Sequence, residues 1–300
     1  AVALDELRAS FAPTLWQPEP DRPADRTLEQ RWFAGDHCDV GGGHAASALS
    51  DHALQWMAQE AAQVGLLLDP ALLAQLRPDH HGVLHDELEG FWRHLRTLPR
   101  AIPAFTAANV GGVLHPSAWR RHVDPPITQA PYGQHIDLQP GQSWSGAVYA
   151  RERWNRTGVW LEAGERYTFE ASGEWIDLKN RSGPGGMRDG HFQLGELAYR
   201  IGDLIALGEE VYRRLTDKPE ADWWATRRVE EAEWFALVGM VGNQPEVHRD
   251  GTAPLGETFC IGDGCTFTPQ RSGYLHAFAN DAWHFYDNNR GSVGLTIRRD

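Results

Sequence analysis

The chain has 300 residues, of which 41% are hydrophobic and 23% are charged, and its net charge at pH 7 is −13. These values are typical of a soluble globular protein that is long enough for two hydrophobic cores. The negative charge argues against binding of nucleic acid through a basic surface, and no apolar run is as long as a bilayer-spanning segment.

Residues 1–125 have the pattern of α/β proteins. "RWFAG" (31–35) predicts a short buried strand, and "SDHALQWMAQEAAQVGLLL" (50–68) predicts a helix capped by Ser50 or Asp51. Apolar residues recur in this helix at helical spacing, which predicts one buried face. They are Leu54, Met57, Ala61, Val64 and Leu68. "DELEGFWRHLRTL" (86–98) predicts a second helix, and the proline-rich stretch at 122–133 predicts a domain boundary.

From residue 134 the chain has the pattern of β-strands. Five segments rich in β-forming residues are separated by Gly, Asn, Asp or Pro, which predicts an antiparallel sandwich over residues 134–300. They are "SWSGAVYA", "GVWLEAGERYTFEASGEW", "WFALVGMVG", "GYLHAFAND" and "SVGLTIRR". Residues 194–217 predict a helical insertion. Cys260 and Cys265 flank a turn-like tetrapeptide, either as a hairpin disulfide or as two free thiols.

An acid-and-glycine segment follows the first predicted strand. In "GDHCDVGGGH", Asp36 and Asp39 precede three glycines, and open α/β sheets place catalytic groups where a strand ends. His115 lies downstream after another glycine pair, in the order acid then histidine that α/β-hydrolases use. Taken alone, these residues are better explained as a turn carboxylate and a loop imidazole.

Four motifs resemble the type VI secretion phospholipase effector family of α/β-hydrolases. They are "AVALDELRASFAPTLW", "RWFAGDHCDVGGGH", "LSDHALQWM" and "VLHPSAWRR", and they cover about the first 120 residues. The resemblance implies that Asp39 is the triad acid, with Asp36 as the alternative, and that His115 is the general base. It also implies that His37, Gly41, Gly42 and Gly43 shape the acid loop. His44 stands where the family usually has tyrosine.

The serine nucleophile of that family lies in a Gly-x-Ser-x-Gly elbow, and the 300 residues contain no such motif. We therefore expect a truncated copy that is inactive alone, and a full-length serine hydrolase acting on phospholipid or another lipid ester. The resemblance implies a secretion-apparatus partner and a bacterial cytoplasmic location before delivery into a target cell. It implies no cofactor for the hydrolytic chemistry.

Oxygen-bearing side chains cluster in "AFANDAWHFYDNNRGSVGLTI" (277–297). Asp281, Asp287, Asn288 and Asn289 lie in a loop between two predicted strands, and calcium binds six to eight such oxygens. An Asn/Asp-rich hairpin turn explains the same residues.

Four segments of the β half resemble the LecA-type calcium-dependent galactose-binding lectins. They are "ASGEW…GPGG", "FALVGMVGN", "SGYLHAFAND" and "YDNNRGSVGLTI". The resemblance implies a Ca²⁺ site with side-chain ligands Asp281, Asn288 and Asn289 and backbone carbonyls of Phe285 and Asp177. It implies a galactoside or other glycan as ligand, with His191 as a weak sugar-selecting candidate.

Three functions are consistent with the sequence. The first is a lipid esterase fragment fused to a calcium- and carbohydrate-binding module. The second is a non-catalytic, calcium-dependent glycan-binding protein with a degenerate hydrolase remnant. In the third, both parts are scaffold.

Overall fold

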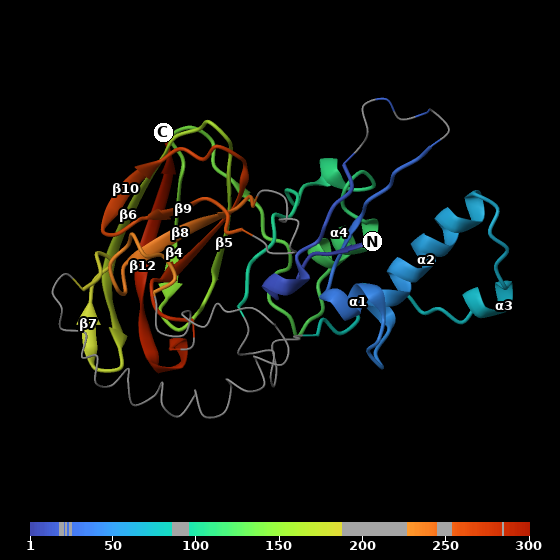
Figure 1. The fold of residues 1–300 in the computed structure, drawn as a ribbon, viewed down its shortest axis with the longest axis horizontal. Coiled ribbons are helices and arrows are strands. Elements are labelled where there is room, and N and C mark those ends of the chain that lie inside the picture. Colours follow the sequence, from blue (N-terminus) through green and yellow to red (C-terminus); the bar gives the residue numbers. More distant parts are fainter. Residues whose placement is uncertain are drawn as a thin grey trace.

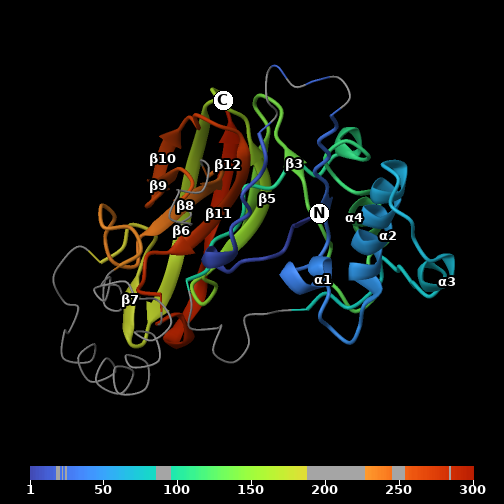
Figure 2. The same ribbon diagram turned by 45° about the vertical axis from the view of Figure 1, so that its right-hand side comes forward.

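A computed structural model describes residues 1–17, 21, 23, 26–85, 96–187, 227–244, 254–283 and 285–300. A β-sandwich lies beside a part that contains the described α-helices, and strand β5 (Asn155–Leu161) lies on the side of the sandwich nearest that part (Figures 1 and 2). The chain starts in the helical part, and its other end lies at one end of the sandwich (Figure 1).

The first part is built on two short parallel strands, β1 (Val2–Ala3) and β2 (Trp32–Phe33). Strand β2 lies where "RWFAG" predicted a strand, and a parallel bridge joins its Trp32 to Leu114. The α-helices of this part are α1 (His37–Gly41), α2 (Ala48–Gln63), α3 (Pro70–Leu73) and α4 (Pro116–Val123), and its short 3-10 helices are η1 (Ala9–Phe11) and η3 (Ala107–Asn109). The described residues of this part support no larger parallel sheet, so the α/β-hydrolase fold stays a prediction.

Helix α2 exists as predicted, but its cap and its buried face differ from the prediction. Its N-cap residue is Ser47, which lies three residues before Ser50, one of the two predicted caps. Leu54, Met57 and Val64, expected in the core, are 53%, 49% and 82% exposed. The helix buries instead the face that carries Leu49 and Ala53. Only its first turns pack on the strands, and the remainder projects away from the molecule with α3 (Figure 1).

The second part is a sandwich of two five-stranded sheets, which confirms the predicted β architecture. One sheet has the order β10-β6-β12-β4 with β7 paired to β6, and the other has the order β3-β5-β11-β8-β9. The strands not yet given are β3 (Ile136–Asp137), β4 (Ser143–Tyr149), β6 (Tyr167–Asp177), β7 (Asn180–Ser182), β8 (Leu237–Gly242), β9 (Thr258–Cys260), β10 (Gly264–Phe267), β11 (Gly273–Ala279) and β12 (Asn289–Arg299). All five predicted strand segments form strands.

The core of the sandwich lies between the two sheets, where inward-facing residues of both sheets meet. Its largest fully buried side chains include Trp175, Tyr167, Phe169 and Phe235. Cys260 ends β9 and Cys265 lies in β10, and these two strands belong to different sheets. Neither cysteine forms a disulfide, nor does Cys38. The sequence had left open whether the first two form a disulfide.

A second apolar cluster joins the helical part to the sandwich. Leu4, Phe105 and Tyr132 of the helical part and its connection pack with Tyr274 of β11. The proline-rich stretch, predicted as a domain boundary, packs at this junction through Tyr132. The predicted insertion at 194–217 and residues 86–95 of the second predicted helix lie outside the described residues. Among the described helices, none is both long and apolar enough to cross a membrane.

Candidate functional site

Asp39 lies in the first turn of helix α1, and its side chain is fully buried. The helix begins there because Asp36 caps it: Oδ1 of Asp36 accepts hydrogen bonds from the backbone N–H groups of Cys38 at 2.9 Å and Asp39 at 2.7 Å. In return, the Asp36 N–H donates to Oδ2 of Asp39 at 3.2 Å. This reciprocal capping box fixes both carboxylates. It identifies Asp36, the alternative triad acid, as the cap of the helix that carries Asp39.

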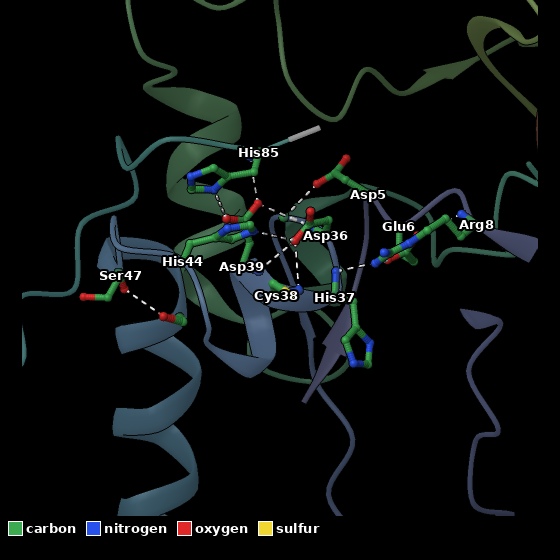
Figure 3. Close-up of polar contacts among 12 residues, drawn as sticks. Asp5, Glu6, Arg8, Asp36, His37, Cys38, Asp39, His44, Ser47 and His85 are labelled. Atoms are coloured by element: carbon green, nitrogen blue, oxygen red, sulfur yellow. Dashed lines mark hydrogen bonds and ion pairs between the residues drawn. The ribbon is translucent and has the colours of Figure 1, made fainter. Parts of the chain in front are cut away.

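The Asp39 carboxylate is hydrogen-bonded to His85. Oδ1 of Asp39 lies 2.6 Å from Nδ1 of the His85 ring, and Oδ2 accepts from the His85 backbone N–H at 3.0 Å (Figure 3). The carboxylate is therefore held by backbone donors on one oxygen while the other orients the imidazole. Sequence reasoning had not selected His85.

This hydrogen bond determines the tautomer of His85. Because a buried carboxylate accepts from Nδ1, the proton is placed on Nδ1 and the lone pair on Nε2. The side chain of His85 is 26% exposed, so the ring is accessible. A carboxylate, an oriented imidazole and a free Nε2 form the acid–base half of a Ser-His-Asp triad.

The other predicted residues of the acid loop surround this pair. The His44 ring stacks on His85 with centroids 3.7 Å apart and planes 16° apart, and its Nε2 lies 3.7 Å from Oδ1 of Asp36. His37 begins helix α1, with its ring edge-on to Phe11. Gly41 ends the helix and Gly42 caps it, and Gly42 and Gly43 have φ values of 87° and 126°. They turn the chain in a conformation that favours glycine.

The predicted Asp39–His115 hydrogen bond is not formed. Nδ1 of His115 lies 2.8 Å from the Ser117 hydroxyl and accepts from the Ser117 N–H, so His115 is the N-cap of α4. Its ring stacks on Phe33 with centroids 4.2 Å apart, and burial lowers the pKa of His115 to about 4. His115 therefore serves local structure in this fold. The structure therefore brings Asp39 together with His85 and not with His115.

A local signal could have identified His85. It lies in "GVLHDE", after a helix and a proline-containing turn and before another predicted helix. Its separation from Asp39 is also compatible with the triad order. The glycine pair and proline around His115 favoured that residue, but the proline is explained by its place as the first residue of α4.

Two groups of histidine and acidic side chains among the described residues have ligand atoms within 4.8 Å of one another: Asp39 with His44 and His85, and Asp79 with His80 and His81. In the first group the two rings are nearly parallel. A metal ion lies in the plane of each ligating ring, so stacked rings direct their lone pairs side by side and do not converge on one ion. The geometry of this group fits acid–base chemistry better than metal binding.

A second polar centre lies in the sandwich where β6 and β12 meet. The register of these strands pairs Asp177 with Asn289. Asn289 donates to Oδ2 of Asp281 at 2.9 Å, and Asn288 donates to Oδ1 of Asp177 at 2.8 Å. The predicted side-chain ligands are thus adjacent, and Phe285 lies at the start of the 3-10 helix η5 (Tyr286–Asn288).

This centre has an excess of negative charge and unpaired oxygens. Burial, and second the nearby charge of Asp177, raise the pKa of Asp281 to about 7. The Oδ1 atoms of Asn288 and Asn289 are buried and have no hydrogen-bond partner among the residues that the structure describes. Buried polar oxygens are normally paired, and Ca²⁺ is bound by carboxylate and amide oxygens. The residues present therefore fit a calcium ion. His191, the sugar-selecting candidate, lies outside the described residues.

Comparison with known proteins finds two similarities. Residues 1–60 match the family model of the type VI secretion system phospholipase effector Tle1-like catalytic domain. No curated protein matches the chain. Among solved structures, the chain is similar to the EclA N-terminal domain, a PllA-like lectin, with 21% identity over 52% of this chain and 96% of that chain and a TM-score of 0.31.

Proposed function

We propose that this chain carries the acid–base pair of a phospholipase effector, in which Asp39 and His85 activate a serine nucleophile. The observation that carries the proposal is the 2.6 Å contact between Asp39 Oδ1 and His85 Nδ1. The match of residues 1–60 to the Tle1-like phospholipase catalytic family supports lipid ester hydrolysis as the reaction. Because the 300 residues contain no Gly-x-Ser-x-Gly motif, we propose that the serine is supplied from outside them.

In this mechanism Nε2 of His85 takes the proton of the serine hydroxyl while its oxygen attacks the ester carbonyl carbon. The imidazolium then gives that proton to the departing alcohol oxygen, which leaves an acyl-enzyme. Water, deprotonated by the same Nε2, releases the fatty acid and regenerates the serine. Throughout, the ionised Asp39 carboxylate keeps the proton of Nδ1 in place and stabilises the imidazolium.

The same substitution, histidine to asparagine, made separately at two positions of the full-length protein tests this assignment. His85→Asn removes the proposed base, so hydrolysis of a phospholipid substrate should fall by about 10³-fold or more. His115→Asn makes the same change at the other histidine but preserves helix capping, since asparagine is a favoured N-cap. It should keep most of the activity. Loss of activity in His115→Asn with retention in His85→Asn would reject the Asp39–His85 pair.

We further propose that the β half binds one calcium ion through Asp281, Asn288 and Asn289, with the backbone carbonyls of Phe285 and Asp177 completing the shell. The two partnerless amide oxygens support this second function. Bound Ca²⁺ would supply positive charge between the carboxylates and open positions for sugar hydroxyls. This chain's residues would hold the loop 281–289 in place. Calcium binding followed by a titration with galactose tests the metal and the glycan separately.

A further inference from the structure

A cavity of about 390 Å³ lies between the two halves of the protein. The helical half contributes Leu4, His85 and Arg100 to its wall, and the sandwich contributes Arg156 from β5 with Tyr274 and His276 from β11. His85, the proposed base, therefore faces a space whose opposite wall belongs to the sandwich. A ligand in this cavity would contact both halves at once.

Direct contacts fix the sandwich wall against the helical half. The Tyr274 hydroxyl accepts a hydrogen bond from the Phe105 backbone N–H at 2.7 Å and lies 3.0 Å from Nδ1 of His135. A wall held by such contacts provides a defined position for a binding group, as selective sites require.

The two arginines of the cavity differ in their availability. Arg100 donates to the backbone carbonyls of Ala3 and Phe11, so its guanidinium is engaged in structure. The Arg156 side chain is 53% exposed, and among the described residues its one ion pair is the long contact with Asp5. An arginine that is loosely paired and exposed at a cavity wall is free to turn toward an anion, and guanidinium matches phosphate in a bidentate geometry.

Asp5 does not compete strongly for Arg156. Its Oδ2 already accepts from the Gly35 N–H at 2.8 Å and from the Tyr132 hydroxyl at 2.7 Å. These two donors remain on Oδ2 when Arg156 moves away from Oδ1 of Asp5. The remaining lining includes apolar side chains that suit the start of an acyl chain: Leu4, Leu84, Ile102 and Phe105.

We propose that Arg156 binds the phosphate of a phospholipid whose acyl ester lies at His85. The sandwich then contributes a residue that determines substrate selectivity, in addition to any glycan or metal that it binds. The cavity wall combines an apolar surface, a base and a cation. These three features match a substrate in which a fatty acyl ester is linked through glycerol to a phosphodiester. This inference rests on the proposed phospholipase function.

Calorimetry with the 300-residue protein tests the binding claim. The probes are dihexanoylphosphatidylglycerol below its micelle concentration, neutral dihexanoylglycerol and inorganic phosphate. Arg156→Gln should weaken binding of the phospholipid about tenfold, the loss expected for one charge-assisted contact, and should not change binding of the neutral lipid. Arg166→Gln is the matched control, because Arg166 is an exposed arginine of the same half that pairs with Asp300 at 3.4 Å.

Equal weakening of both lipids, no weakening, or the same weakening in Arg166→Gln would overturn the proposal. Inorganic phosphate that binds through Arg156 without competing with the phospholipid would also overturn it, since the site would then serve free phosphate.

Turnover in the full-length protein separates this inference from the proposed function. If His85→Asn abolishes hydrolysis of phospholipid and neutral ester alike while Arg156→Gln alters neither, only the role of Arg156 is rejected. If His85→Asn leaves hydrolysis intact, the phospholipase mechanism is rejected.

Discussion

Gly35 and Asp39 are packed so closely that a β-carbon on residue 35 would lie 2.3 Å from the β-carbon of Asp39. Gly35 also has a φ of 111°, which side chains rarely adopt. The buried acid therefore occupies the space that any other residue at position 35 would need. The glycine before helix α1 matters directly to the geometry of the Asp39–His85 pair.

Gly35→Ala should destabilise the protein by about 1–3 kcal/mol, through backbone strain and the clash with Asp39. Urea unfolding of the 300-residue protein measures the loss. Gly41→Ala is the control, because an added β-carbon there meets nothing within 4 Å and residue 41 is helical. It should leave stability unchanged or raise it slightly. Equal losses in both variants would show that residue 35 has no special constraint.

Asp39→Asn should uncouple the proposed base from its orienting group. An amide can present its N–H₂ group to His85 Nδ1, which favours the tautomer with the proton on Nε2 and removes the free base. In the full-length protein, phospholipid hydrolysis should fall on the order of 10⁴-fold. Nitrogen-15 NMR of the histidine rings should show the change of tautomer in the 300-residue chain. An unchanged His85 tautomer would contradict the role of Asp39.

The 300-residue chain alone should hydrolyse no ester. Its sequence contains no Gly-x-Ser-x-Gly elbow, so His85 has no such serine to activate. Incubation with p-nitrophenyl butyrate and with a short-chain phospholipid measures this directly. Ester cleavage that His85→Asn abolishes would show that another group within the 300 residues is the nucleophile.

Calcium should raise the melting temperature of the 300-residue protein. An ion that binds only the folded loop at 100 times its Kd adds about 2.7 kcal/mol of stability. Asp281→Asn should abolish the shift, because it removes one of the carboxylates next to the proposed ion. Asp287→Asn, at an exposed acid of the same loop, should preserve it. Calorimetry that detects no binding at millimolar calcium would reduce the loop to a structural turn.

Acid should destabilise the protein through His276. This side chain is 6% exposed, and burial followed by the charge of Arg156 lowers the pKa of His276 to about 3. The unfolded chain binds a proton near the ordinary value of 6.5, whereas the folded chain stays neutral. Stability should therefore fall as pH drops from about 6.5 to about 3. The free energy of unfolding should be measured by denaturation across this pH range. It should fall less steeply with pH in His276→Gln than in His37→Gln, a variant at an exposed histidine.

The strands of the sandwich were predictable because their signals are local. β-Forming residues bounded by Gly, Asn, Asp and Pro mark strands wherever they occur, and the pairing of Asp177 with Asn289 follows once β6 and β12 are neighbours. The order of the strands in each sheet was not predictable, since it depends on contacts between distant segments. The short strands β3, β7, β9 and β10 have too few residues for a pattern.

The helical half was less predictable for two physical reasons. Helix α2 has an apolar row that includes Leu54, Met57 and Val64, and periodicity shows that such a row exists without showing what covers it. In the described residues nothing covers it, and the helix packs through Leu49 and Ala53. Choosing between His85 and His115 required distances, because both histidines follow Asp39 in the triad order and both stand beside turn-forming residues.

The position of β12 determines when the sandwich can form during synthesis. This strand, Asn289–Arg299, lies between β6 and β4 and pairs with both. A nascent chain on the ribosome therefore holds the two flanking strands with an empty place between them until residues 289–299 emerge. Because β12 begins at Asn289, the oxygens around Asp281 also assemble only then. Chains released before residue 289 would expose two strand edges in the middle of a sheet, which makes them substrates for aggregation and proteolysis.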